Sequence, residues 1–528
     1  MIRKNVAEIL DHHVTFELEA IDRMYLNAYV PSLQTGGGFV YFLKTQLGVR
    51  VPSTVMIAPM SYRFVEAIER FVETEGVDLV TFKKGQRKDD VAKKYLTDFQ
   101  EEEGVLFVGK AQEKASVFRT EKRRDARGTY PWIIRSTVPV NHYYVYLVDR
   151  DFGPLFIKFC TYFPYAAKVC LNGHEWLKRQ LTRRGIAYEP LDNGIRSTED
   201  AARVQDIANQ LDAAKIDAFV RKWFRRLPHP FTAAHRAAGY RYQLSILQAE
   251  FALTQVLDRP LTGRCFFEEV IRENLDIGRP DQMQLIFDRR VTRRTPGTFR
   301  TRVLTEGVVP SLHVQYKKSK VKQYHKEGQA LRTETTINDT YDFQIGRALR
   351  NLPALREIGF AANRRLLRVE SLSHDCLIGD DRLHAVTTPV LVDEQRAAAL
   401  RFGDRRVQAL MHALCLFALA PTGFRHREFR TYVAQLQNRE PDTYSAGSMT
   451  YDLRRLRLHG LIERVPRSHR YRITQTGAQV AMFYARLYTR ALRPAWSLHP
   501  SGSARAQRAF DRLDAALAHF LEELKLAA

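Results

Sequence analysis

Cysteine is scarce in this sequence, and the cysteines that are present lie far apart. There are five in 528 residues, at Cys160, Cys170, Cys265, Cys376 and Cys415. No two of them have a C-x-x-C spacing, and the sixteen histidines do not gather around them as the ligands of a structural zinc site would. We therefore expect buried, reduced thiols, with neither disulfides nor structural zinc.

Long apolar stretches are also missing. The longest, ALCLFALAP at 413–421, is far shorter than the roughly 20 residues that cross a bilayer. The first residues, MIRKNVAEILDHHV, lack the apolar run of a signal peptide. We expect a soluble, cytoplasmic protein that has no membrane partner.

Several catalytic motifs are absent. The sequence has no G-x-x-x-x-G-K-[ST] loop, so it gives no indication of P-loop nucleotide hydrolysis, and it has no G-x-S-x-G. The segment HEWLK at 174–178 lacks the second histidine of a zinc-protease helix, so His174 is expected to be a helix N-terminal residue.

Acidic residues are too few to balance the basic ones. The 82 lysines and arginines outnumber the 59 aspartates and glutamates, which gives a net charge of +23 and a pI near 9.8. A cationic surplus attracts phosphates and gains free energy from counterion release. Nucleic acid is therefore the expected partner; an anionic membrane and an inert basic surface are the alternatives.

The order of apolar patterns predicts a mixed α/β (α+β) multidomain protein. We expect the following parts: an α/β domain at 1–190, a helical domain at 191–287, a basic strand-rich segment with a helix at 288–380, a linker at 381–404, a winged helix at 405–492 and an amphipathic helix at 493–528.

Individual elements follow from the period of the apolar residues. In the first part we expect strands at 16–29, 55–58, 79–82, 105–108, 143–148, 155–159 and 168–171, with helices at 62–74, 88–99 and 175–184. Helical spacing then continues through Leu244, Leu247, Phe251 and Val256. Further strands are expected at 299–304, 312–316, 320–324 and 331–337, followed by helices at 343–349 and 352–367.

The most specific pattern lies between Arg405 and Leu487. Two amphipathic helices precede SMTYDLRRLRLHGLIERVPRSHRYRITQTG, in which Ser448 is the expected N-cap of a third helix and Gly460 its end. Two short strands and a further helix follow. This order resembles the winged-helix domains of bacterial regulators of the MarR and ArsR kind, and the resemblance implies DNA binding. A wing that binds only protein is the alternative.

The charges of this region favour DNA. Residues 405–475 hold thirteen arginines, no lysine and five acidic residues, a net charge of +8. We expect Thr450, Tyr451, Arg454 and Arg455 on the outer face of the third helix, where they would meet the major groove. Residues of the hairpin are expected to contact phosphates or the minor groove; they are Arg467, His469 and Arg470.

A second basic surface is expected between residues 289 and 326, where eleven lysines and arginines face one acidic residue. Its loop contains Arg289, Arg290, Arg293 and Arg294, and the following strand carries Lys318, Lys320 and Lys322 on one face. Such a strand would track phosphates without reading sequence, although a solvated edge strand is the alternative. The cluster KKGQRKDDVAKK at 83–94 mixes both signs of charge.

Two further patterns in the sequence suggest catalytic activity on nucleic acid. Asp149 and Asp151 follow the strand YYVYLV and would hold Mg²⁺ or Mn²⁺, with Asp22 and Glu334 completing the set; a turn at 149–153 is the alternative. The stretch VKQYHKEGQALRTETTI is similar to a K-x-Y-x-K and R-x-E pattern of some phage and plasmid replication initiators. That resemblance implies DNA nicking by Tyr324 with a metal-bound carboxylate. The His-hydrophobe-His metal motif of many nicking enzymes is absent.

The expected function is therefore nucleic-acid binding, with DNA preferred, in gene regulation or in a mobile-element, replication or defence context. The alternatives are a metal-dependent nuclease or nicking enzyme and an RNA-binding component of a ribonucleoprotein. At 510–524 an apolar stripe of helical period predicts a helix that pairs with its copy in a homodimer or packs on its own winged helix.

Overall fold

The computed structural model describes residues 6–83, 85–125, 128–263, 265–266, 270, 299–304, 311–326, 330–374, 378–417, 423–437, 439–440, 443–466 and 468–488. The described residues form two compact units, one made of those up to 270 and from 299 to 367, and the other of those from 368 to 488. Helices and a large sheet make up the described residues, which confirms the mixed α/β class. None of the helices in these ranges has the length and hydropathy needed to span a bilayer.

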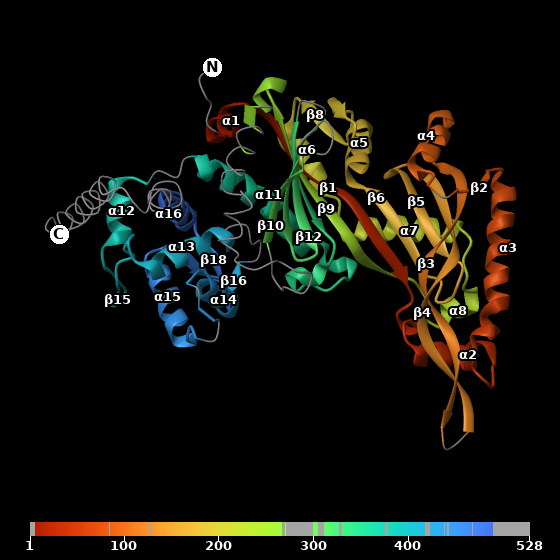
Figure 1. Ribbon diagram of the computed structural model, residues 1–528. Coiled ribbons are helices and arrows are strands. Elements are labelled where there is room, and N and C mark those ends of the chain that lie inside the picture. Colours follow the sequence, from red (N-terminus) through yellow and green to blue (C-terminus); the bar gives the residue numbers. More distant parts are fainter. Residues whose placement is uncertain are drawn as a thin grey trace, which may run out of the picture. The chain divides into compact units, whose positions relative to one another are not determined.

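One sheet organises the first unit (Figure 1). Its strands run in the order β10-β11-β12-β13-β9-β1-β6-β5-β4-β3-β2. All neighbours are antiparallel except β2 and β3. The bounds are β1 (Val14–Tyr29), β2 (Leu79–Thr81), β3 (Gly104–Asp125), β4 (Gly128–Asp149), β5 (Gly153–Cys160), β6 (Ala167–Asn172), β9 (Gln243–Leu257), β10 (Phe299–Leu304), β11 (Ser311–Tyr316), β12 (Ser319–Lys326) and β13 (Ala330–Ile337). A separate hairpin joins β7 (Tyr188–Leu191) to β8 (Gly194–Thr198).

Helices precede, separate and follow these strands. They are α1 (Val6–His12), α2 (Gly36–Leu47), α3 (Ala58–Glu75), α4 (Lys88–Asp98), α5 (Gly173–Arg183), α6 (Ala201–Asn209), α7 (Ala213–Arg226), α8 (Ala233–Ala237) and α11 (Leu352–His374). Short 3-10 turns are η1 (Pro31–Leu33), η2 (Thr54–Ile57), η3 (Thr340–Phe343) and η4 (Leu349–Asn351). The strand expected at 55–58 and the helix expected at 343–349 are therefore wrong, because these apolar segments are shorter than a full element and form single turns.

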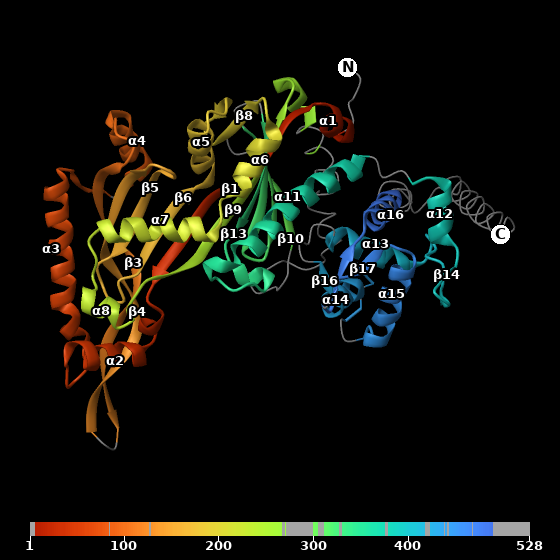
Figure 2. The same cartoon turned by 180° about the vertical axis from the view of Figure 1, so that it is seen from behind.

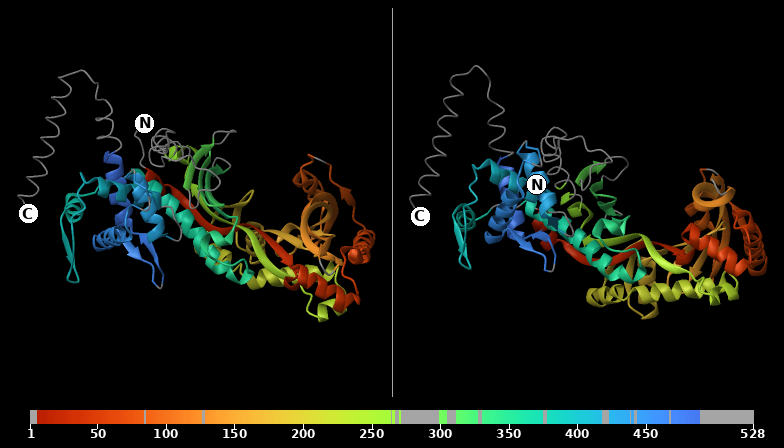
Figure 3. Two further views of the ribbon diagram at one scale, coloured as in Figure 1. Left: turned by 60° about the horizontal axis from the view of Figure 1, so that its bottom comes forward. Right: turned by 90° about the horizontal axis from the view of Figure 1, so that it is seen from below.

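The main core lies on one face of the sheet. Helix α7 packs Ile216, Phe219, Val220 and Trp223 into it, at the spacing of one helix face. Figures 2 and 3 show α7 and α11 on the same side of the sheet. On the opposite side, Tyr144 and Tyr146 of β4 pack with residues of α4. The alternation of β4 thus places two different clusters on its two faces.

The prediction that helical spacing continues through Leu244–Val256 is wrong. These residues form β9, which lies between β1 and β13 in the interior of the sheet. Residues 251–257 are all buried, so the apolar residues on the two faces of the strand do not alternate with polar ones. The helices α6, α7 and α8 of the expected helical domain pack in the same unit as this sheet.

In the second unit, the elements from Arg405 onward occur in the predicted order. They are α13 (Arg405–Phe417), α14 (His426–Leu436), α15 (Ala446–Leu458), β17 (Ile462–Arg464), β18 (Arg470–Ile473) and α16 (Gln475–Arg486). A further strand, β16 (Phe424–Arg425), completes a sheet of order β16-β18-β17. The expected linker at 381–404 is structured instead, because it contains α12 (Asp380–Thr387) and the paired strands β14 (Val390–Val392) and β15 (Gln395–Ala397). The expected helix at 493–528 lies outside the described residues.

Candidate functional site

Asp149, the first carboxylate of the predicted metal pair, is a structural anchor. It ends β4 and is almost completely buried. Oδ1 accepts hydrogen bonds from the backbone N–H groups of Asp151 and Phe152 at 2.8 and 3.0 Å. Oδ2 accepts from Lys222 Nζ and Trp223 Nε1, both at 2.8 Å. Burial opposes ionisation, but these bonds outweigh it and lower the pKa of Asp149.

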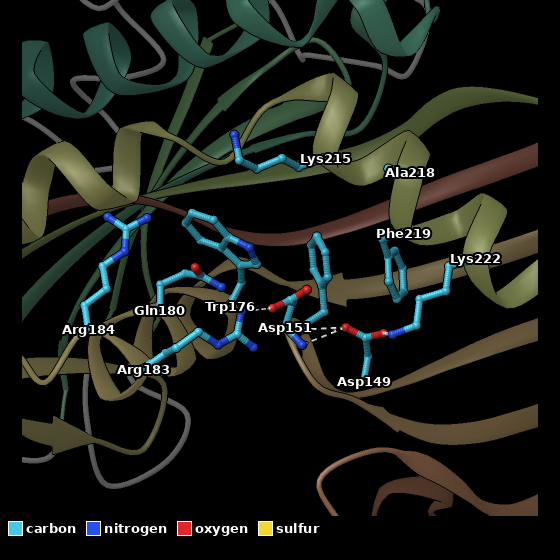
Figure 4. Close-up of a pocket in the computed structure, with 11 residues that line it drawn as sticks. Asp149, Asp151, Trp176, Gln180, Arg183, Arg184, Lys215, Ala218, Phe219 and Lys222 are labelled. Carbon is cyan, nitrogen blue, oxygen red and sulfur yellow. Dashed lines mark hydrogen bonds and ion pairs between the residues drawn. The ribbon is translucent and has the colours of Figure 1, made fainter.

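Asp151 faces another partner. Its Oδ1 lies 2.5 Å from Arg183 Nη1, at the edge of a cavity of about 360 Å³ that Trp176 and Phe219 also line (Figure 4). Because both oxygens of Asp149 are engaged, the pair does not form the predicted metal site and the turn at 149–153 is found in its place. Within the described ranges, no three His, Cys, Asp or Glu side chains are arranged to hold a metal ion.

The other predicted residues do meet. Strands β12 and β13 pair Tyr324 with Arg332 and Lys322 with Glu334, so all four side chains lie on one face of the sheet. Tyr324 Oη donates a hydrogen bond to Glu334 Oε1 at 2.9 Å. Tyr324 and Glu334, both named as candidate site residues from the sequence, are therefore neighbours in the structure. Asp22 of β1 joins them because it accepts a hydrogen bond from Arg332.

Arg332 is the centre of this cluster, and its side chain is fully buried. Its Nη2 donates to Asp22 Oδ2 at 2.9 Å and its Nε to Glu334 Oε1 at 3.1 Å. Two further bonds run from Nη1 to Thr254 Oγ1 at 2.7 Å and to the carbonyl oxygen of Asn193 at 3.0 Å. The sequence did not indicate this role, because nothing near Arg332 in the chain marks it as buried.

His174 completes the cluster from the first turn of α5. The side chain of Asn172 caps that helix by accepting from the N–H groups of His174 and Glu175, as expected for a helix start. His174 Nε2 lies 2.6 Å from Arg332 Nη2, so the ring accepts this hydrogen bond and is neutral. Burial, reinforced by Arg332, lowers the pKa of His174 to about 3. In the described part of the chain, Nδ1 has no hydrogen-bond partner.

The carboxyl groups of the cluster differ in their tendency to ionise. Burial opposes ionisation of Asp22, but Arg332 outweighs burial and lowers its pKa strongly. Burial raises the pKa of Glu334, and the nearby charge and hydrogen bond of Asp22 add to that rise. Glu250 of β9 has its pKa raised to about 7 by burial and by these two carboxylates. The cluster thus combines one firmly ionised carboxylate with two that exchange protons more readily.

A divalent metal does not fit this arrangement. Asp22 and Glu334 both form ion pairs with the Arg332 guanidinium. The guanidinium therefore occupies the position between the two carboxylates and provides the positive charge that Mg²⁺ or Mn²⁺ would otherwise provide. His174 Nε2 accepts a hydrogen bond from the same group, so its lone pair is already engaged. We therefore derive no chemical step through a metal ion from these residues.

The lysines predicted to share a strand face divide into two groups. Lys318 precedes β12 and forms an ion pair with Asp339 at 2.6 Å, so it is not part of the face. Lys320 is exposed on β12, and Lys322 Nζ lies 4.1 Å from the centre of the Tyr324 ring. The predicted loop contacts Arg289, Arg290, Arg293 and Arg294 lie outside the described residues.

The third helix of the second unit, α15, has one exposed and one buried face. Met449, Leu453 and Leu456 are buried. The exposed face carries Thr450, Tyr451 and Arg454, also as predicted, and in addition Arg457. Arg457 was missed although it follows Arg454 by three residues, which places it on the same face.

Arg455 is not on the outer face. It is 7% exposed, its Nε donates to the carbonyl oxygen of Ala398 at 2.9 Å, and its Nη2 donates to that of Ala399. The prediction was wrong because the chain at 398–399 packs beside the helix with free carbonyl groups that the sequence does not reveal. Arg455 therefore fixes this segment to α15.

The first two turns of α15 are held by an ion pair whose carboxylate, Asp452, is buried and whose arginine, Arg406, is half-buried. Ser445, not the predicted Ser448, is the N-cap. Arg406 of α13 donates to Asp452 Oδ2 at 2.9 Å, and the same oxygen accepts a hydrogen bond from Tyr444. These bonds fix the first two turns of the helix, which carry Thr450 and Tyr451.

The β17–β18 hairpin adds cations of two kinds. His469, Arg464 and Arg472 are exposed, and Arg472 lies 3.9 Å from Glu463. Arg470, in contrast, donates to the carbonyl oxygen of Gly423 at 2.9 Å and ties β18 to β16. Arg467 lies outside the described residues.

Comparison with protein-family models, curated proteins and solved structures gives no match for this chain.

The state of His174 generates a test of the cluster. Between pH 6.5 and 3 an unfolded histidine binds a proton that the buried ring does not, so the unfolded state gains stability as the pH falls. We expect this single group to steepen the loss of folding free energy by up to about 1.4 kcal/mol per pH unit in that window. The variant His174→Gln keeps an acceptor for Arg332 but cannot take up this proton. The slope of its folding free energy against pH should therefore be smaller than that of the wild type by up to about 1.4 kcal/mol per pH unit. Denaturant unfolding at pH 4, 5, 6 and 7 measures it.

The control is His12→Gln, which removes an exposed histidine and should leave the slope as in the wild type. An unchanged slope in His174→Gln would mean that His174 is protonated in the folded protein.

Proposed function

We propose that the protein binds nucleic acid, with duplex DNA as the preferred partner, through the exposed face of α15 and the adjoining β17–β18 hairpin. The observation that carries this proposal is the composition of one helix face. Thr450, Tyr451, Arg454 and Arg457 are all exposed, lie on one face because Arg454 follows Thr450 by four residues and Tyr451 and Arg457 flank it at three, and end in hydrogen-bond donors. The opposite face is buried, so these are the side chains that a partner would meet.

A helix face of this kind suits the major groove of DNA. The groove is wide enough for a helix, and arginine binds the O6 and N7 atoms of guanine with two hydrogen bonds. Tyr451 is 43% exposed, so its ring and hydroxyl group are accessible on the same face. The same side chains support binding to duplex RNA less well, because the RNA major groove is too narrow for a helix.

The cations of the hairpin support binding to the backbone. Arg464, His469 and Arg472 follow α15 directly and are exposed. Phosphate contacts of this kind position a protein on DNA without reading its sequence. In the first unit, Lys320 and Lys322 on β12 offer a second set of cations for a phosphate backbone.

The three neighbouring arginines of α15 provide a direct test. Arg454→Ala and Arg457→Ala should each weaken binding to a selected duplex by about 1–3 kcal/mol if they contact a base, and reduce the preference over a scrambled duplex. Arg455→Ala should leave the affinity of the folded protein unchanged and lower its stability by about 1–3 kcal/mol, because two carbonyl groups lose their donor. Fluorescence anisotropy and thermal unfolding measure the two effects.

Arg401→Ala, which removes an exposed arginine elsewhere in the second unit, is the matched control. If the Arg454 and Arg457 variants bind both duplexes like wild type, α15 does not contact DNA and the protein-binding alternative takes its place. If they lose affinity for both duplexes equally, α15 holds only the backbone.

A second candidate function is cleavage of a phosphodiester bond by Tyr324. One observation favours it: the 2.9 Å hydrogen bond between Tyr324 Oη and Glu334 Oε1, a nucleophile beside a base whose pKa is raised by burial. Glu334 would take the phenolic proton as Oη bonds to phosphorus. The bond from phosphorus to the leaving sugar oxygen would break, and that oxygen would take up a proton from a water molecule, whose hydroxide is neutralised by the proton that Glu334 later releases.

This candidate predicts a covalent protein–DNA adduct. Wild type should nick single-stranded or supercoiled DNA, with Mg²⁺ or Mn²⁺ supplied in the assay, and retain one new DNA end on the protein. Tyr324→Phe should abolish both products and leave DNA binding intact. The exposed Tyr341 gives the matched control, Tyr341→Phe, which should nick as wild type. Absence of nicking by wild type on every DNA tested with either metal rules out this function.

A further inference from the structure

The hairpin of β3 and β4 is much longer than the sheet requires. Each strand has 22 residues, and the pairing continues to Asp125 and Gly128. The body of the unit holds the hairpin as far as Thr120, which is bonded to the backbone N–H and the hydroxyl of Thr54. Beyond that point the strands 121–125 and 128–132, here called the arm, extend away from the other described elements (Figures 1 and 2).

Cations outnumber acidic residues along the first strand of the arm and the two residues that lead into it. Residues 119–125 include four basic and two acidic residues. Lys122 and Arg124 are exposed and occupy alternate positions of β3, so they share one face of the ribbon. Arg119 and Arg123 occupy the opposite face and are also exposed, and both lie near Glu121 at 3.9 and 3.5 Å. Cations therefore lie on both faces of a two-stranded ribbon.

The arm also carries an exposed aromatic ring. Trp132 lies opposite Glu121 in the register of the two strands and is 46% exposed. The guanidinium carbon of Arg123 lies 5.0 Å from its ring centre. Such a pair stabilises an isolated hairpin. It also presents a flat, donor-rich surface near the base of the arm.

We propose that the arm enters a groove of duplex DNA, where its two faces meet the phosphates of the two groove walls. This inference rests on the proposed function and adds a second contact to it. A flat acidic surface would engage one face of a ribbon, whereas a groove has a negative wall on each side. The major groove is about 12 Å wide and admits a two-stranded ribbon. Five residue pairs at about 3.4 Å per residue give the arm roughly 17 Å of reach, more than the groove depth of about 8.5 Å.

The test compares the two faces. Lys122→Gln/Arg124→Gln removes the cations of one face, and Arg119→Gln/Arg123→Gln removes those of the other. Arg203→Gln/Arg225→Gln removes two exposed arginines from α6 and α7 and is the control of equal charge. Affinity for a 30-base-pair duplex is measured by anisotropy over a series of salt concentrations, with thermal unfolding to verify that each variant is folded.

Each face variant should reduce the slope of log affinity against log salt by about 1.8, because each phosphate contact contributes about 0.9. The affinity at low salt should fall about tenfold or more, and the control should change little. In wild type, bound duplex should also protect the bonds after Lys122, Arg123 and Arg124 from trypsin.

Loss of affinity in only one face variant, or in neither, would overturn groove insertion, as would unchanged trypsin cleavage at saturating duplex. In those cases the Arg454 and Arg457 variants would still report on the proposed function. If wild type itself binds no duplex, the proposed function fails first.

Discussion

The guanidinium of Arg332 is the interaction on which the rest of the first unit depends. It binds side chains or carbonyl groups from β1, β9, the β7–β8 turn and α5, with Asp22 separated from it by 310 residues in sequence. A fully buried cation costs several kcal/mol unless every donor is paired, and here the partners come from segments that meet only in the completed fold. The same contacts fix β13 against β9 in register, which sets Tyr324 and the lysines of β12 on one face of the sheet.

The function proposed for the chain depends on how cations are divided between structure and surface. Arg332, Arg406 and Arg455 are held by carboxylates or carbonyl groups of the protein and stabilise elements. Arg454, Arg457, Lys122 and Arg124 are exposed, so a phosphate backbone can reach them. The net charge of +23 indicates a phosphate-bearing partner but does not say which cations meet it. The burial of each side chain in the folded protein decides whether its cation stabilises the structure or is available to a partner.

Parts of this structure follow from the sequence, and the reasons are local. Strands with one buried face, such as β6, alternate clearly, and the leucines and glycine of 453–461 mark the end of α15. The central strand β9 was not predictable from period, because both its faces are buried. The full length of β3 and β4 was missed because the arm has no core to alternate against. At the site, Tyr324 and Glu334 lie close in sequence and were found together. The contact between His174 and Arg332 could not be predicted without the strand order of the sheet. The burial of Arg455 could not be predicted without the position of residues 398–399.

The most direct test of this account is the free energy of opening of β9 and β13, measured by native-state hydrogen exchange of their backbone amides. Arg332→Met should lower that free energy by about 3–5 kcal/mol, because Asp22 and Glu334 are left buried without their cation. The triple variant Asp22→Asn/Arg332→Met/Glu334→Gln, which has no buried charge at these positions, should recover most of the loss. A loss below about 1 kcal/mol in Arg332→Met, or a triple variant as unstable as the single one, would contradict the central role of Arg332.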